Sequence, residues 1–174
     1  MPGLLRHYRG AVAPRVRAAD HPAHLARWYT DAGVASDAVP VTTADLDLAR
    51  TVREAVYRAA KAAIDGTPPA PADEEIINRA AAAPPPVPRL HQGMVTSTGA
   101  GLDPAASALS AVARDAISLL ATTDARRLHE CASPECGLLF VDTSRPGRRR
   151  WCSSTACGGK ARAAAYRQRR WPAS

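Results

Sequence analysis

The stretch CASPECGLLFVDTSRPGRRRWCSSTAC, residues 131–157, holds all four cysteines of this 174-residue chain. They are Cys131, Cys136, Cys152 and Cys157, two pairs with four-residue gaps on either side of a fifteen-residue excursion. Zinc accepts four thiolates in a tetrahedron and has no geometric preference of its own, so two close pairs joined by a returning segment suit it. The pattern predicts one structural Zn2+ ion. Four separate thiols, or two disulfides in an exported protein, are the alternatives.

The residues around the cysteines predict a β-hairpin followed by a helix. LLFVDT (138–143) has strand character, SRPGR (144–148) is typical of a turn, and RRRW (148–151) is expected to return as the second strand. Ser153 or Ser154 then caps a helix whose first turn contains the fourth cysteine, where the helix dipole favours a thiolate. A hairpin followed by a helix that supplies the last ligands is a treble-clef-like zinc finger.

The positive charge of the chain is concentrated beside the cysteines. The net formal charge is +7, and residues 131–174 carry nine basic residues against two acidic ones, which accounts for the whole excess. Such a local excess indicates a polyanionic partner: DNA, RNA or, less often, an anionic membrane. About six to nine phosphate contacts would make binding steeply salt-dependent. The candidate contact residues are Arg148, Arg149, Arg150, Lys160, Arg162, Arg167, Arg169 and Arg170.

The preceding part of the chain predicts a helical domain with minor β content. Only 5% of the residues are aromatic, so its core must be built mainly from Ala, Val and Leu, and Ala has the best helix propensity. Apolar spacing and capping residues predict helices over 20–33, 41–66 and 74–82 and one that begins at Asp103. The expected caps are Asp20, Thr42 or Thr43, Asp73 and Asp103. One or two short strands are expected within 87–102.

We expect a mainly α fold with three parts along the chain. Residues 1–19 form a loose arm, residues 20–125 the helical domain, and residues 126–174 the zinc finger with its basic C-terminal helix. The division near residue 125 follows from the end of the helical pattern and the shift in charge.

The cysteine segment resembles the CGNR-type zinc finger. The resemblance lies in the cysteine pairs, an F-x-D-x-S element (Phe140, Asp142 and Ser144) and the RRWCS return over 149–153. Residues 21–128 resemble, more diffusely, the mostly helical ABATE domain that precedes this finger. The resemblance implies a bacterial family regarded as stress-responsive transcription regulators. It favours DNA over RNA and implies that the N-terminal domain senses a signal or dimerises.

The chain departs from the family pattern in two places. Its signature tetrad reads Cys157-Gly158-Gly159-Lys160, so Gly159 and Lys160 stand where the family has Asn and Arg. Lys keeps the positive charge but lacks the planar fork that bonds phosphate or guanine in two places. In addition, the hydrophobic strand that the family has near its N-terminus is not evident before Asp20.

The sequence does not favour catalysis. A four-cysteine zinc site is closed and leaves no metal position for a substrate. His21 and His24 fit capping or surface roles. His129 lies two residues before Cys131 and is a possible substitute zinc ligand, but four cysteines already complete the site. STGAGLD (97–103) lacks the lysine and the strand–helix frame of a phosphate-binding loop. We therefore expect a protein that is not an enzyme.

These observations predict a cytoplasmic, zinc-dependent DNA-binding protein that regulates transcription, with a homodimer possible because one asymmetric finger reads little sequence. No apolar run approaches the roughly 18 residues of a membrane span, so no membrane association is expected. The Arg-rich first 19 residues leave a transit peptide open. Two further alternatives are a zinc-stabilised protein-interaction module and an RNA-binding protein. The effector and the DNA site are unknown from the sequence.

Overall fold

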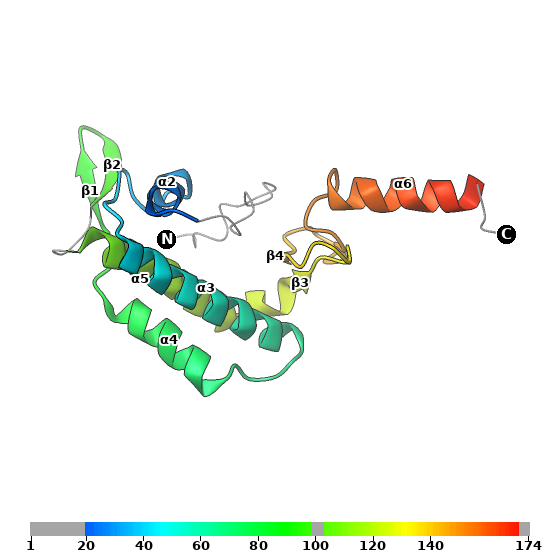
Figure 1. Cartoon of the computed structure of the whole chain (residues 1–174), viewed down its shortest axis with the longest axis horizontal. Helices are drawn as coiled ribbons and strands as arrows, with labels where there is room; N and C mark the ends of the chain where they lie inside the picture. Colours follow the sequence, from blue (N-terminus) through cyan, green and yellow to red (C-terminus); the bar gives the residue numbers. More distant parts are fainter. Residues whose placement is uncertain (1–19, 99–102, 171–174) are drawn as a thin grey trace.

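The structure is a computed structural model that describes residues 20–98 and 103–170. The predicted loose arm over 1–19, and with it the question of a strand before Asp20, lie outside the described residues. Figure 1 shows a helical body, a small segment at its end that contains the cysteines, and a last helix that extends away from both. The predicted fold class, mainly α with minor β, is confirmed.

Within the described residues, four α-helices form the body. They are α2 (Pro22–Asp31), α3 (Thr43–Ile64), α4 (Pro71–Ala82) and α5 (Pro104–Leu120). Small side chains let the backbones of α3, α4 and α5 approach closely, and the buried cluster between them consists of Ala55, Ala59, Ile77, Ala81 and Ala113. A second cluster around Tyr29 and Leu46 joins α2 to α3 and α5. The alanine-rich core that the composition predicts is therefore present.

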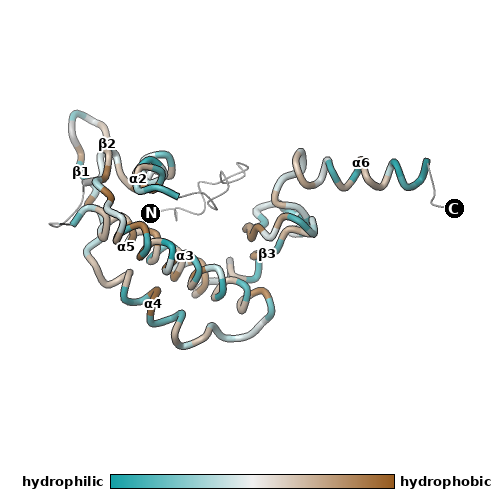
Figure 2. Tube along the Cα trace, viewed as in Figure 1, coloured by the Kyte–Doolittle hydropathy of each residue, from teal (hydrophilic) through white to brown (hydrophobic). Residues whose placement is uncertain are grey.

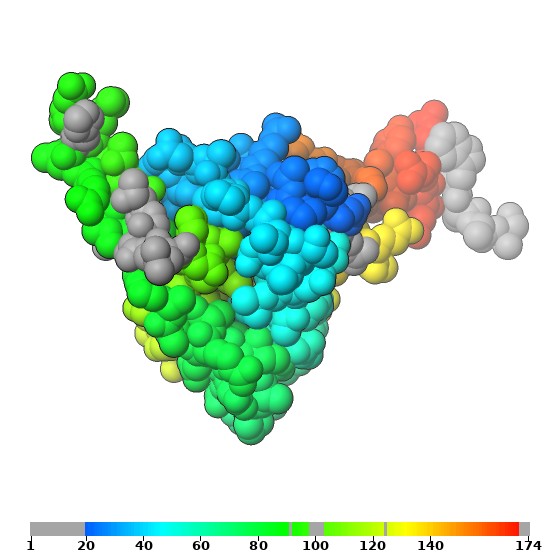
Figure 3. Space-filling model, turned by 60° about the vertical axis from the view of Figure 1, so that its left-hand side comes forward, coloured from blue at the N-terminus to red at the C-terminus, as the bar shows by residue number. Residues whose placement is uncertain are grey.

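The two short strands predicted within 87–102 are present as a hairpin. β1 (Val87–His91) pairs antiparallel with β2 (Met94–Thr98). The turn residues Gln92 and Gly93 have φ values of 48° and 78°, which is the pattern of a two-residue turn that matches strand twist. Figure 3 shows this hairpin standing out from the helical body.

Two of the predicted helix caps are confirmed by hydrogen bonds. The Thr42 hydroxyl accepts a hydrogen bond of 3.2 Å from the Asp45 N–H. The Asp45 carboxylate in turn accepts one of 2.8 Å from the Thr42 N–H, which completes a capping box. The Asp103 carboxylate accepts one of 2.9 Å from the Ala106 N–H. These caps fix where α3 and α5 begin.

The other two caps are corrected. His21, not Asp20, caps α2, because its Nδ1 accepts a hydrogen bond of 3.2 Å from the Ala23 N–H. α4 begins at Pro71, three residues before the predicted start, because proline suits the first helical position, where no N–H is needed. Asp73 therefore lies inside the helix rather than at its cap.

Asp73 ties α4 to α3 through an ion pair. Its carboxylate is 5% exposed and accepts two hydrogen bonds from Nε of Arg58, at 3.0 and 3.1 Å, and another from the second guanidinium nitrogen at 2.5 Å. The hydrogen bonds from Arg58 lower the pKa of Asp73 below its usual value. This is the bidentate pairing for which arginine is suited.

The segment after α5 contains a 3-10 helix η2 (Thr123–Arg127), strands β3 (Leu128–Glu130) and β4 (Leu139–Val141), and α6 (Cys157–Arg170). The predicted partner of the strand at 138–143 was wrong: β4 pairs antiparallel with β3, and residues 148–151 form no strand. The carboxylate of Asp142 accepts a hydrogen bond from the Arg149 N–H, so this N–H does not donate to a neighbouring strand. Residues 148–151 are still bonded to the turn that holds the first cysteine pair, because the Arg150 carbonyl accepts a hydrogen bond of 2.8 Å from the Ala132 N–H.

None of the helices in the described ranges has the length and apolar character needed to cross a membrane.

We expect Asp73→Asn to lower the melting temperature by a few degrees at pH 7, because it removes the charge that pairs with Arg58. The folded-state pKa of Asp73 lies below its unfolded value of about 3.9, so its contribution is present above that pH and is lost as pH falls through the folded pKa. The difference between wild type and variant should therefore shrink below about pH 4. Thermal melts followed by circular dichroism check this.

Glu74→Gln is the matched control, since Glu74 is the exposed neighbour in the same helical turn. If the Asp73→Asn difference stayed constant from pH 7 to pH 3, the pair with Arg58 would not be its source.

Candidate metal centre and basic helix

The first cysteine pair sits in a turn that backbone hydrogen bonds shape. The Cys131 N–H donates to the Leu138 carbonyl at 2.9 Å, and the Cys136 N–H donates to the Ser133 carbonyl at 2.9 Å. Gly137 follows with φ +60°, a left-handed conformation that glycine adopts without strain. The chain therefore turns directly after Cys136 and leads into β4.

All four cysteine side chains converge on one point. Their Sγ atoms lie within 4.8 Å of one another, and the printed separations are 3.6 Å for Cys136–Cys152 and 3.7 Å for Cys152–Cys157. Sulfurs about 2.3 Å from a tetrahedral zinc ion lie about 3.8 Å apart, whereas a disulfide requires about 2.05 Å. The four cysteines form no disulfide with one another. The cluster fits one structural Zn2+ ion, as the sequence predicts.

The metal-free thiols differ in acidity. Burial raises the pKa of Cys131, but hydrogen bonds from the backbone N–H groups of Cys152 and Ser133 outweigh it and bring the value down to about 7. Burial, together with the neighbouring Cys136, raises the pKa of Cys152 above its ordinary value. Zinc requires thiolates, so its binding must displace protons, and affinity should fall as the pH is lowered.

A buried carboxylate organises the excursion between the two pairs. Asp142 is 0% exposed; its Oδ1 accepts from the Ser144 N–H at 2.9 Å and its Oδ2 from the Arg149 N–H at 2.8 Å. Burial raises the pKa of Asp142, but these hydrogen bonds outweigh it, so the pKa is lowered. The F-x-D-x-S element is therefore a structural device that closes the loop over 142–149.

Arg149 is engaged within the finger itself. Its Nε donates to the Trp151 carbonyl at 2.9 Å, another guanidinium nitrogen donates to the Cys152 carbonyl, and the guanidinium lies 5.0 Å from the centre of the Phe140 ring. These contacts hold the second cysteine pair against β4. A nucleic-acid contact from Arg149 stays a prediction, but the structure gives this side chain a positioning role beside the metal ligands.

Ser153, one of the two predicted caps, lies four residues before the first residue of α6 and shapes the turn that leads into the helix. Its hydroxyl accepts from the Ala156 N–H at 3.1 Å, and its carbonyl accepts from the Gly158 N–H at 2.9 Å. A Cβ on Gly158 would lie 3.4 Å from the Ser153 carbonyl oxygen and 3.5 Å from the Trp151 ring, which are ordinary van der Waals contacts. At Gly159, by contrast, a Cβ would meet nothing within 4 Å.

The structure places the remaining predicted contact residues on the surface. Arg150 lies over the Trp151 ring at 5.2 Å, and Arg162 donates to the Ser154 carbonyl at 2.9 Å. α6 extends away from the body (Figure 1) and is largely hydrophilic toward its end (Figure 2). The exposed basic side chains are Arg148, Arg150, Lys160, Arg162, Arg167, Arg169 and Arg170.

Contacts between the helical body and the finger were missed by the sequence reasoning. Lys61 of α3 pairs with Glu130 at 2.6 Å, and the Tyr57 hydroxyl donates to the Gly137 carbonyl at 3.3 Å. Arg127 donates from Nε to the Asp142 carbonyl at 2.7 Å. Tyr57 and Lys61 lie one helical turn apart on α3, which was the only available signal, and nothing in the sequence identifies their partners.

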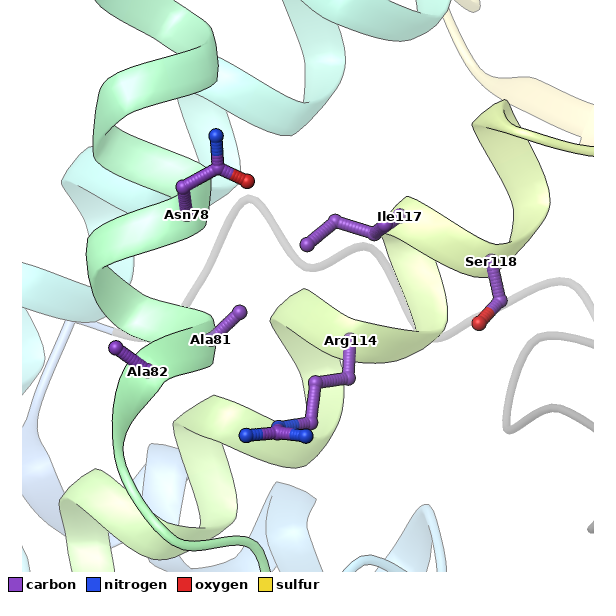
Figure 4. Close-up of a pocket in the computed structure, with 6 residues that line it drawn as sticks. All are labelled: Asn78, Ala81, Ala82, Arg114, Ile117 and Ser118. Carbon is purple, nitrogen blue, oxygen red and sulfur yellow. The ribbon is translucent and has the colours of Figure 1, made fainter.

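A groove of about 410 Å3 lies between α4 and α5 on the helical body. Figure 4 shows Asn78 and Ala81 of α4 across from Ile117 and Arg114 of α5. Nε of Arg114 is bonded to the buried Ser110 hydroxyl at 3.2 Å, which holds the arginine at the edge of the groove. The groove is lined by a guanidinium, an amide, a hydroxyl and three apolar side chains, which belong to Arg114, Asn78, Ser118, Ala81, Ala82 and Ile117.

Comparisons with known families divide the chain in two. The ABATE family model, described as "Putative stress-induced transcription regulator", matches residues 7–123, and the CGNR zinc finger model matches residues 127–170. A search of curated proteins gives no match. The two matched ranges meet close to the predicted division near residue 125, and the domain limits themselves stay a prediction.

We expect the purified chain to carry one zinc ion and Cys152→Ser to carry none, because three thiolates and a neutral hydroxyl form a much weaker site. Metal content measured by mass spectrometry checks this. His129→Ala is the control: its ring packs against Phe140 at 5.8 Å rather than joining the cysteines, so this variant should keep one zinc. Loss of zinc from His129→Ala would contradict the four-cysteine site.

We expect Arg149→Ala to weaken zinc binding about 10- to 100-fold, as is common for partners that orient metal ligands. The reason is the loss of its bonds to the Trp151 and Cys152 carbonyls. Competition with a chromophoric chelator measures the affinity. Arg148→Ala removes the same charge from the exposed neighbour and should leave zinc affinity unchanged. If both variants weakened zinc binding equally, Arg149 would act through its charge alone and not by positioning the ligands.

Proposed function

The chain belongs to the ABATE family and ends in a CGNR zinc finger, and from this premise we propose that it is a zinc-dependent DNA-binding transcription regulator. In this proposal the finger binds DNA, and the helical domain senses a signal or dimerises. The family supports regulation, and the charge of the finger supports the nucleic-acid partner.

The observation that carries the proposal is the charge and placement of α6. Its sequence, CGGKARAAAYRQRR, contains five basic residues and no acidic one, so no carboxylate on the helix neutralises them. Helices of the body carry both signs of charge, as Arg27 pairs with Asp31 and Arg79 with Glu75. A projecting helix whose own charged residues are all basic is complementary to a phosphate backbone.

Zinc supplies the rigid base of this helix. Cys157 is both the fourth ligand and the first residue of α6, so metal binding fixes the direction in which the basic side chains project. Arg148 and Arg150 add exposed charge from the loop before the second cysteine pair.

The groove between α4 and α5 supports a sensing role for the helical domain. Arg114 and Asn78 at its rim, with Ile117 between them, are suited to a small anionic ligand that has an apolar part. A homodimer would supply the second half-site that a single finger lacks.

We further propose that the protein acts in the cytoplasm and is not an enzyme. Four thiolates occupy every position of a tetrahedral zinc ion, so the metal has no open position for a substrate.

Replacing Arg167 and Arg169 together by Gln should weaken binding to duplex DNA and make its salt dependence less steep. Each lost phosphate contact lowers the slope of log K against log salt by about 0.9, so the double variant should lose about 1.8. Fluorescence anisotropy with a labelled duplex over a salt series measures this. Arg27→Gln with Arg79→Gln is the matched control, since it removes two exposed arginines from the body.

Absence of duplex binding by the wild type at low salt would overturn the proposal and leave protein recognition as the function of the finger. Tighter binding to single-stranded RNA than to duplex DNA would select the RNA alternative. Equal slopes for the α6 variant and the body variant would place the interface elsewhere.

A further inference from the structure

We propose that α6 lies in the major groove of B-form DNA and reads base edges with a strip formed by Gly159, Ala163 and Tyr166. The charged residues on the two edges of the strip hold the phosphates of the two strands. This inference rests on the proposed DNA binding and goes further, because it names the reading face, the groove and the residues that set sequence preference.

The strip is defined by the helical geometry and the burial of α6. At about 100° per residue, Gly159, Ala163 and Tyr166 fall on one face of the helix, with Arg170 at the far end of the same face, and Cys157 and Ala161 fall on the opposite one. The burial agrees beyond the first turn: Cys157 and Ala161 are half-buried, whereas Ala163 and Tyr166 are exposed; Gly159, in the first turn, is half-buried as well. The strip therefore points away from the metal centre.

Basic residues border the strip on both edges. Lys160 and Arg167 lie on one edge, and Arg162 and Arg169 lie on the other. A helix with its side chains is about 10–12 Å across, and the major groove of B-form DNA is about 12 Å wide. Two charged edges at that spacing are each within reach of one phosphate strand when the strip faces the groove floor.

The chemistry of the strip suits base edges: apart from Arg170 at its far end it carries no charged side chain, and arginine is itself a common bidentate contact for guanine. Glycine and alanine let the backbone approach the bases closely, and an alanine methyl group is a recognised contact for the thymine methyl. Tyr166, with 55% of its surface exposed, adds an aromatic face and a hydroxyl that can donate and accept. Exposure alone assigns no role, since single apolar residues are common on surfaces. The position of Tyr166 between two charged edges is what assigns it to the bases.

The open position at Gly159 strengthens this assignment. The family name places Asn third in the tetrad, and this chain has glycine there, with nothing within 4 Å of where a Cβ would lie. Any side chain at this position would project from the strip toward the partner. Residue 159 is therefore a specificity position, and glycine there leaves reading to Ala163 and Tyr166.

The geometry also separates DNA from double-stranded RNA. The major groove of an A-form helix is deep and too narrow to admit an α-helix. The charged edges could still touch the phosphates of RNA, but the strip could not reach its bases. Duplex DNA is therefore the expected partner.

The test selects bound duplexes from a random DNA library with the full-length, zinc-loaded chain and compares wild type with Tyr166→Ala. Wild type should enrich a short motif. Tyr166→Ala should lose the preference at one or two positions and bind the enriched duplex roughly tenfold more weakly or worse, with an unchanged salt slope. Gln168→Ala, an exposed change away from the strip, should behave as wild type. One zinc per chain in each variant shows that the finger is folded.

The inference is overturned if Tyr166→Ala enriches the same motif with the same affinity, or if a matching RNA duplex binds as tightly as the DNA duplex. A wild type that binds DNA with steep salt dependence but enriches no motif also overturns it, while the proposed DNA binding stands. A wild type that does not bind DNA removes both. Gly159→Asn offers a gain-of-function check, since it should change the enriched motif without loss of zinc.

Discussion

The tetrahedral convergence of four thiols is the constraint on which the C-terminal module depends. Its strands β3 and β4 have three residues each, and its most buried side chain of any size is a carboxylate, Asp142, so it has little apolar core of its own. A module this small ordinarily needs a metal or disulfides to fold. The zinc ion joins residues from 131 to 157 at one point, and the free energy of metal binding becomes folding free energy.

Polar groups then set the shape around the metal and attach it to the body. Asp142 gathers backbone N–H groups of its own loop, while Arg149 binds carbonyls beside the third cysteine. Arg127 of η2 donates a hydrogen bond to the Asp142 carbonyl in the same loop. From α3, Lys61 pairs with Glu130 and Tyr57 donates to the Gly137 carbonyl, on either side of the first cysteine pair. The orientation of α6 is therefore connected to α3 of the helical body through contacts of about 3 Å. Any change at the body that moved α3 would therefore reach the metal centre at the base of α6.

The sequence was sufficient where local chemistry decides and insufficient where distant partners do. Cysteine spacing, the cap at Thr42 and the apolar spacing of α3 each report on neighbours within a few residues, and those predictions are confirmed. The pairing of β4 failed because its partner β3 has only three residues and no alternating pattern to detect. The bonds of Arg149 within the finger were not foreseen either, because charge along the chain cannot show that one of three consecutive arginines contacts carbonyls of its own module.

The link between zinc and nucleic acid follows from how a short helix forms. α6 has 14 residues, a length at which an isolated helix is marginal in water, and its like charges oppose folding further. The costly step is the first turn, and here Cys157 among the metal ligands and the Ser153–Ala156 turn before it fix the start of the helix in advance. In the proposed complex, phosphates at the two edges of the helix would relieve the charge repulsion along the rest of it. Zinc would then supply the helix nucleus and the polyanion the remaining stabilisation, so that a structural metal with no catalytic position could still govern binding.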